Sequence, residues 1–119
     1  MTTIFEYVDD ALSSLSPAVP YAMGTYLTPT GAALPDVFIT YTLVDGSPEQ
    51  SADDAETQRT YRVQVSIFSR EGLVSLPAVD AAMLAEGFTR GPERALPYDV
   101  QTRHFGIAKD YFFLEDEQA

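Results

Sequence analysis

Apolar and polar side chains alternate along residues 60–69, the period of a strand with one buried face. The preceding run, Val37–Val44, is apolar or aromatic at nearly every position, which predicts a more interior strand. Three further segments predict shorter or closing strands: Tyr21–Leu27, Tyr98–Arg103 and Phe105–Leu114. The stretch GPERALP at 91–97, directly before Tyr98, contains glycine and two prolines and predicts a loop.

Two other segments carry apolar residues at helical spacing. The first runs from Thr3 to Leu15 and is stopped by Pro17. The second runs from about Leu73 or Ser75 to Glu86, with Pro77 tolerated in its first turn and Gly87 suited to the position after its end. The inner stripes are Ile4, Val8, Ala11, Leu12 and Leu15 in the first helix, and Leu76, Val79, Ala82 and Met83 in the second.

The order of these elements is helix, three strands, helix, two strands. Strands joined without crossover helices favour an antiparallel sheet, so we expect an α+β fold. Its sheet would be antiparallel, or mixed, with four to five strands and both helices on one face. The 119 residues predict one domain, 1–119, with a frayed acidic tail at 115–119.

The segment between the two central strands, residues 45–58, is strongly acidic and holds no basic residue. It has no apolar anchor larger than alanine, so we expect a flexible loop that binds a partner. A calcium loop needs oxygen ligands at alternating positions and a closing bidentate glutamate, and this segment has no such register. The acids of this predicted partner-binding loop are Asp45, Glu49, Asp53, Asp54 and Glu56.

The net charge of −11, from 18 acids and 7 bases, argues against direct binding to nucleic acid, because phosphate contacts need lysine and arginine. An anionic membrane surface would also repel the chain. No apolar run approaches the roughly 20 residues of a membrane span, and the amino-terminal segment lacks the basic start of a signal peptide. The sequence thus predicts a protein made in the cytoplasm.

Candidate catalytic and metal-binding residues are sparse. The chain has no cysteine, which excludes thiol chemistry and a thiolate zinc site. His104 is the single histidine, without the imidazole or cysteine partners that a zinc or acid–base site needs, so we expect a structural or surface role. Phosphate-loop, dinucleotide, nucleophile-elbow and zinc-protease motifs do not occur. We therefore expect no enzyme, no cofactor and no metal.

Three consecutive aromatic residues, Tyr111, Phe112 and Phe113, lie in the last predicted strand. Alternation sends Phe112 to the face opposite the other two, so a strand here shows aromatic groups on both faces. A large apolar group away from the core usually marks an interface. We expect Phe112 or Phe113 to contact a neighbouring subunit.

Read in order, the chain resembles the tail completion (tail terminator, tail-to-head joining) proteins of long-tailed, siphovirus-like bacteriophages and their prophages. The likeness extends from about Ile4 to Leu114 and is carried by structural residue types rather than by a catalytic signature. The residues that carry it are Pro35, Tyr41, Pro48, Ala52-Asp53-Asp54, Glu56, Arg62–Ser69, Gly87-Phe88, Tyr98, Thr102, His104 and Phe113-Leu114.

The resemblance implies a non-enzymatic virion component that caps the finished tail tube as a ring, taken to be sixfold, and joins it to the head. Its partners would be further copies of itself, the major tail tube protein and the head–tail connector protein. It would be made in the cytoplasm of the host bacterium and end in the virion, at the head–tail interface. A small cytosolic adaptor or regulatory binding module with the same α+β sheet is the alternative.

Overall fold

The structure is a computed structural model that describes residues 3–15, 18–24, 33–50, 58–74 and 76–116. Two helices and five strands follow one another in the predicted order of helix, three strands, helix and two strands. Their bounds are α1 Ile4–Ser13, β1 Tyr21–Met23, β2 Val37–Gln50, β3 Gln58–Ser69, α2 Val79–Ala85, β4 Thr89–Asp99 and β5 His104–Asp116.

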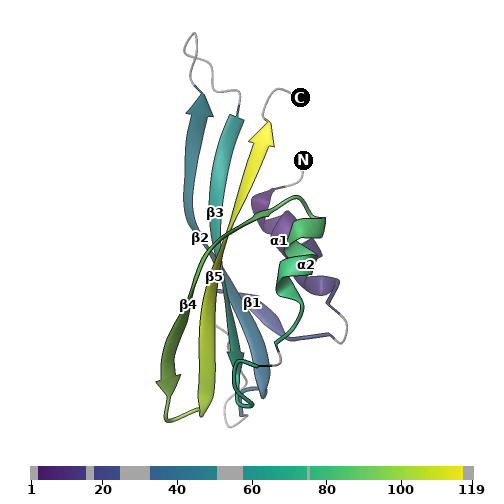
Figure 1. The fold of residues 1–119 in the computed structure, drawn as a ribbon. Coiled ribbons are helices and arrows are strands. Elements are labelled where there is room, and N and C mark those ends of the chain that lie inside the picture. The colour runs from purple at the N-terminus through teal and green to yellow at the C-terminus, as the bar shows by residue number, and fades with distance from the viewer. Residues whose placement is uncertain (1–2, 16–17, 25–32, 51–57, 75, 117–119) are drawn as a thin grey trace.

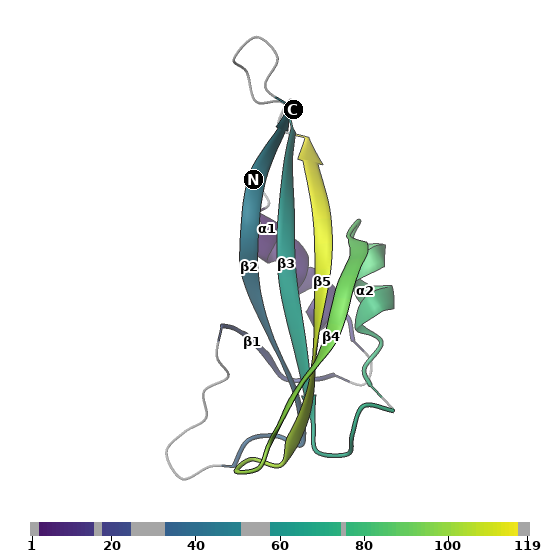
Figure 2. The ribbon, with the colours of Figure 1, turned by 60° about the vertical axis from the view of Figure 1, so that its left-hand side comes forward.

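The five strands form one mixed sheet with the order β1-β2-β3-β5-β4, in which β1 pairs parallel to β2 and every other pair is antiparallel. Both helices lie on the same face of this sheet (Figures 1 and 2). The fold class is therefore confirmed: α+β, with the mixed sheet that the sequence allowed. The molecule is elongated, 54 × 26 × 26 Å, because its strands run along one axis (Figure 1).

Helix α1 begins where the sequence places it. The Thr3 side chain caps it by accepting a hydrogen bond from the Glu6 amide at 3.3 Å, which satisfies one of the free amides at a helix start. All five residues of its predicted stripe are buried against the sheet.

Helix α2 is shorter than predicted, because it begins at Val79 and not within residues 73–78. The prediction placed Pro77 in the first turn, but a residue before proline avoids helical geometry, so Leu76 cannot belong to the helix. The end of α2 agrees with the prediction. Gly87 has φ of 101°, and the Phe88 amide donates to the Met83 carbonyl at 3.1 Å, closing a Schellman motif.

The stretch 91–97 is not a loop, as predicted, but the middle of strand β4. This strand lies at the edge of the sheet, where proline is tolerated because one side of the strand has no ladder partner. Its pairing with β5 shifts register between Arg90 and Glu93, at Gly91-Pro92, and a second shift lies between Leu96 and Asp99. The predicted strand Tyr98–Arg103 is instead the end of β4 and the turn to β5.

The core lies between the sheet and the helices. Val63, Val65 and Ile67 on β3 face it, and each is at most 2% exposed. They share one buried cluster with Val79 and Met83 of α2 and with the buried stripe of α1, so both helices cover the same face of the sheet.

Candidate assembly surfaces

One end of the sheet extends beyond the helices as an arm of three strands (Figure 1). In this arm Asp45–Gln50 of β2 pair with residues 58–62 of β3, and those pair on their other side with residues 112–116 of β5. We call residues 45–50, 58–62 and 112–116 the arm. Because β3 lies in its centre, the arm is a small antiparallel sheet, not a single strand pair.

The arm corrects two predictions. The flexible loop predicted at 45–58 is strand at both ends, since the ladder continues past the Asp45-Gly46 turn signal through register shifts at 43/45 and 48/50. The tail predicted at 115–119 is likewise strand at Glu115 and Asp116, which pair with Arg59 and Gln58. Of the predicted acids, Asp45 and Glu49 lie on β2, whereas Asp53, Asp54 and Glu56 lie outside the described residues.

Both edges of the arm are open within the part of the chain that the structure describes. Strand β1 pairs only with residues 39–41 of β2, and the pairing of β4 with β5 reaches no further than Thr89 and Phe112. On the side away from β3, β2 beyond Thr42 and β5 beyond Phe112 therefore pair with no strand of the described residues. An open strand edge is a ready template for another chain.

The two candidate interface aromatics occupy opposite faces of β5, as the alternation predicts. Phe113 lies on the helix side, with its ring centroid 4.6 Å from that of Tyr7 and 4.9 Å from that of Phe88. Phe112 lies on the outer face, where the guanidinium of Arg62 stands 5.9 Å from its ring centroid. Gly91 leaves room for this ring, since a Cβ there would lie 2.5 Å from it. Of the two, Phe112 is therefore the one on the face that the helices leave uncovered.

A buried carboxylate lies beside Phe112 on the outer face. Asp110 is 1% exposed, and both Nε and Nη2 of Arg62 donate to its Oδ2 atom. Its Oδ1 atom is buried and has no hydrogen-bond partner among the described residues. Because a buried carboxylate is costly without a partner, Arg62 ties the outer faces of β3 and β5 together.

A second polar cluster ties α2 to the sheet on the helix side. The Tyr111 hydroxyl donates to Oδ1 of Asp80, and Lys109 Nζ lies 3.3 Å from Oδ2 of the same carboxylate. Burial alone would raise the pKa of Asp80, but the hydrogen bond from Tyr111 and the charge of Lys109 outweigh it, so this pKa lies below its usual value. Burial and the same hydrogen bond raise the pKa of Tyr111 well above its usual range.

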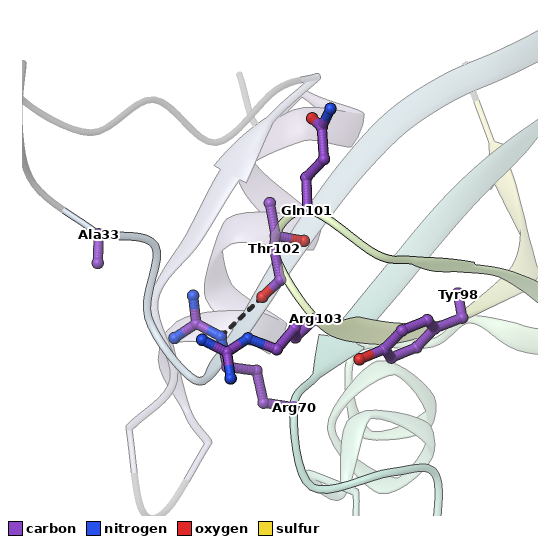
Figure 3. Close-up of a pocket in the computed structure, with 6 residues that line it drawn as sticks. All are labelled: Ala33, Arg70, Tyr98, Gln101, Thr102 and Arg103. Carbon is purple, nitrogen blue, oxygen red and sulfur yellow. Dashed lines mark hydrogen bonds between the residues drawn. The ribbon is translucent and has the colours of Figure 1, made fainter.

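At the opposite end from the arm, the β4–β5 turn borders a polar hollow. The hollow has a volume of about 500 Å³ and is lined by side chains of four segments (Figure 3). A smaller hollow of about 290 Å³ shares Thr102 with it and is lined by apolar groups such as Leu34, Phe38 and Phe68. We call the two together the corner. The larger hollow is lined by Ala33, Arg70, Tyr98, Gln101, Thr102 and Arg103.

His104 has the structural role that the sequence predicts for it. It is 2% exposed, its Nε2 atom lies 2.8 Å from the Pro35 carbonyl oxygen, and its ring meets that of Phe38 edge-on at 5.0 Å. Its Nδ1 atom is buried without a partner among the described residues. The contact joins the start of β5 to the chain that leads into β2.

In the described part of the chain, no group of three or more acidic or histidine side chains is placed to hold a metal ion. No helix there is long and apolar enough to cross a membrane. Comparison with models of protein families and with curated proteins finds no match to this chain.

The sequence analysis named Phe112 and Phe113 but not the polar groups of the outer face and the corner. Asp110 and Arg62 are 48 residues apart, and Arg70 and Thr102 are 32 apart, so only the strand pairing brings each pair together. One signal was available: Asp110 is a charged residue inside an apolar strand pattern, and such a residue usually has a buried partner.

Proposed function

We propose that this protein is a tail completion protein of a long-tailed phage, a virion component that caps the tail tube as a ring. It joins the tail to the head connector, and its partners are further copies of itself in a ring of six, the major tail tube protein and the connector protein. It acts at the head–tail interface of the virion after synthesis in the host cytoplasm. No catalytic step, cofactor or nucleic-acid contact is part of this role.

The observation that supports the proposal most is the arm. A closed ring of identical subunits needs two different surfaces on each subunit, because each copy contacts one neighbour on either side. The arm offers two different open edges, one on β2 and one on β5, and it projects beyond the helices where a neighbour has access (Figure 2). The outer-face position of Phe112 adds an aromatic contact next to the β5 edge.

The charge of the chain fits this role as well. A surplus of 11 negative charges keeps free subunits apart by mutual repulsion, so assembly waits for a specific docking partner. It also keeps the protein off the packaged genome, whose phosphates would repel it.

The test is deletion of the gene from the phage, followed by negative-stain microscopy of the lysate. We expect filled heads beside separate tails, some of abnormal length, and complete virions again when the gene is supplied in trans. Normal complete virions from the deletion would contradict the proposal and favour the adaptor alternative. Genes for a major tail protein, a connector and a tape-measure protein next to this one would support it independently.

A further inference from the structure

The turn between β4 and β5 places an arginine in a backbone conformation that suits glycine. Arg103 has φ of 63°, and among the described residues it alone has a positive φ without being glycine. The turn itself is well bonded: the Arg103 amide donates to the Asp99 carbonyl at 2.7 Å, and Asp99 Oδ1 accepts from the two amides that follow. Because a Cβ makes this conformation unfavourable and glycine has none, the Arg103 side chain calls for an explanation.

The Arg103 side chain lies next to a second arginine that is held in place. Arg70 donates from Nε to the Thr102 carbonyl at 2.9 Å. Its Nη1 atom donates to the Leu34 carbonyl at 3.0 Å and to Asp36 Oδ1 at 2.9 Å, whereas its Nη2 atom has no hydrogen-bond partner among the described residues. Both guanidinium groups line the larger hollow and lie on the same side of it (Figure 3).

The nearby carboxylates do not neutralise Arg103. Its side chain is exposed and makes no hydrogen bond or ion pair within the described ranges. Asp36 is engaged by Arg70, and Asp99 is engaged by the amides of its own turn, which lower its pKa. Two adjacent guanidinium groups with unused donors attract an oxyanion, and arginine binds a carboxylate in a forked, charge-assisted geometry.

The charge of the whole chain limits what this positive site can take. A surplus of 11 negative charges repels a polyanion such as nucleic acid or a run of acidic side chains, so an occupant with a single carboxylate is favoured. The same repulsion disfavours a second free copy of the chain, which carries its own surplus. The occupant is therefore a partner that brings one negative charge to the corner.

The smaller hollow of the corner indicates what is attached to that carboxylate. It has a volume of about 290 Å³, it is lined by apolar groups such as Phe38 and Phe68, and it shares Thr102 with the larger hollow. Neighbouring residues of an extended chain point to opposite sides, so a carboxylate and an apolar group this close together come from one residue. The last residue of a chain has this arrangement, because its carboxylate and its side chain are bonded to the same Cα.

The larger hollow has room for more than a carboxylate. Its volume is about 500 Å³, and its wall includes Tyr98, whose ring centroid lies 4.7 Å from that of Phe105. Tyr98 is 44% exposed and Phe105 is 41% exposed, so this aromatic pair is open to a partner. A hollow of this size suits several residues of a chain better than a small acid.

We propose that the corner binds the carboxyl terminus of a partner protein whose last residue is apolar. The terminal carboxylate lies against Arg103 and the unpaired Nη2 atom of Arg70, and the last side chain fills the smaller hollow. The residues before it cross Tyr98. This inference goes beyond the proposed function, since it names the chemistry of a partner and holds for a virion protein and an adaptor alike.

The first experiment titrates the purified protein with the tetrapeptide acetyl-Ser-Tyr-Ser-Leu and follows its backbone amides by NMR. We expect saturable shifts around Thr102 and Arg103. The same peptide with a carboxamide end should bind about tenfold more weakly or less, since it lacks the charge that the arginines bind. N-acetylleucine and inorganic phosphate should bind more weakly too, because the first lacks the preceding residues and the second lacks the apolar side chain.

The second experiment repeats the titration with variants. Arg103→Gly should weaken binding by about tenfold or more and should melt at or above the wild-type temperature, because glycine suits the turn. Arg103→Lys keeps the charge without the fork and should fall between the two. Arg94→Gln, at an exposed arginine of β4 outside the corner, makes a matching loss of one positive charge and should bind as the wild type does.

Several results would overturn the inference. These are no binding of the tetrapeptide at millimolar concentrations, equal binding of its carboxamide form, or an Arg103→Gly chain that binds like the wild type. Equal binding of phosphate would show an adventitious ion only, equal binding of N-acetylleucine would show a site for a small acid, and association of the chain with itself through the corner would make a second copy the occupant. None of these measurements needs phage, so their failure leaves the deletion test of the proposed function standing.

Discussion

The Nε atom of Arg62 lies 3.0 Å from Oδ2 of Asp110, across β3 and β5 on the face of the sheet that the helices leave uncovered. The two side chains differ in environment: that of Arg62 is 41% exposed, whereas that of Asp110 is 1% exposed. Arg62 is therefore partly exposed to solvent and neutralises a carboxylate that is itself buried. This pair gives the first prediction.

Replacing Arg62 with methionine should lower the free energy of unfolding by roughly 2–4 kcal/mol, because it leaves the Asp110 carboxylate buried and unpaired. Chemical denaturation at pH 7 measures the change. Arg94→Met makes the same substitution at an exposed site on β4 and should cost less than about 0.5 kcal/mol. Equal costs for the two variants would show that Asp110 does not depend on Arg62.

The second prediction separates the two neighbouring phenylalanines of β5. Phe113→Ser should destabilise the protein by roughly 3 kcal/mol, since its ring packs on Tyr7 and Phe88 between sheet and helices. Phe112→Ser should cost less than half as much, because its contacts on the outer face are with Arg62 and the space left by Gly91. Denaturant melts compare the two, and an assembly assay should show that Phe112→Ser reduces incorporation into particles despite its smaller effect on folding. Equal unfolding costs would mean that both faces of the strand are buried in the monomer.

The free energy of unfolding should fall at alkaline pH, because two tyrosines with raised pKa values lose their protons there. The hydrogen bond that Tyr21 donates to Asp9 Oδ1 at 2.7 Å is the main cause that raises the pKa of Tyr21 to about 12, and burial raises that of Tyr111 further still. The unfolded chain releases these protons near pH 10 and the folded chain only at higher pH, so the folded state binds more protons between the two values. The stability that the protonated Tyr21 and Tyr111 hydroxyls contribute is thus fully present below about pH 10. It is lost as the pH rises from there towards the pKa values of the two tyrosines in the folded protein.

Thermal melts between pH 8 and pH 12 measure this loss. The variants Tyr21→Phe and Tyr111→Phe should each show a shallower decline above pH 10 than the wild type. A wild type whose melting temperature is flat up to pH 12 would contradict the prediction.

The fourth prediction concerns residues 51–57, which join the two strands of the arm hairpin. Replacing them with Asn-Gly should preserve the fold, because Gln50 and Gln58 already form the last strand pair and this dipeptide suits a two-residue hairpin turn. The melting temperature should change little, whereas incorporation into particles should be lost with the acids Asp53, Asp54 and Glu56. Asp53→Asn with Asp54→Asn and Glu56→Gln tests the charge alone at full length. A shortened chain that unfolds, or one that assembles normally, would contradict the prediction.

The parts of the fold that the sequence predicts are those set by local signals. The α1 stripe, the alternation along β3 and the turn at Gly87 each depend on residues within one element, and each is confirmed. Strand β4 was missed because Gly91, Pro92 and Pro97 are loop residues by composition. Strand β4 tolerates these residues because it lies at the edge of the sheet, and no local sequence pattern reveals that position.

The continuation of β2 to Gln50 was missed for a related reason. Asp45-Gly46 is a turn signal by itself, but Arg59 donates to the Gly46 carbonyl at 2.9 Å and Tyr61 pairs directly with Gly46 across the hairpin. These partners lie 13 and 15 residues away, and the shift in register after Leu43 absorbs the irregularity. Residues of the corner were missed altogether, because Arg70 and Arg103 come together only after β3 and β5 have paired.

The three long strands of the arm continue without interruption into the main sheet, and they run along the 54 Å axis of the molecule (Figure 2). Hydrogen bonds between antiparallel strands are perpendicular to the strands. A force along the strand axis that pulls β3 one way and its neighbours the other way therefore loads many of these bonds at once, in shear. A sheet loaded this way resists extension far better than one whose bonds open singly from an end. A protein built on such strands would carry tension along its length with little deformation.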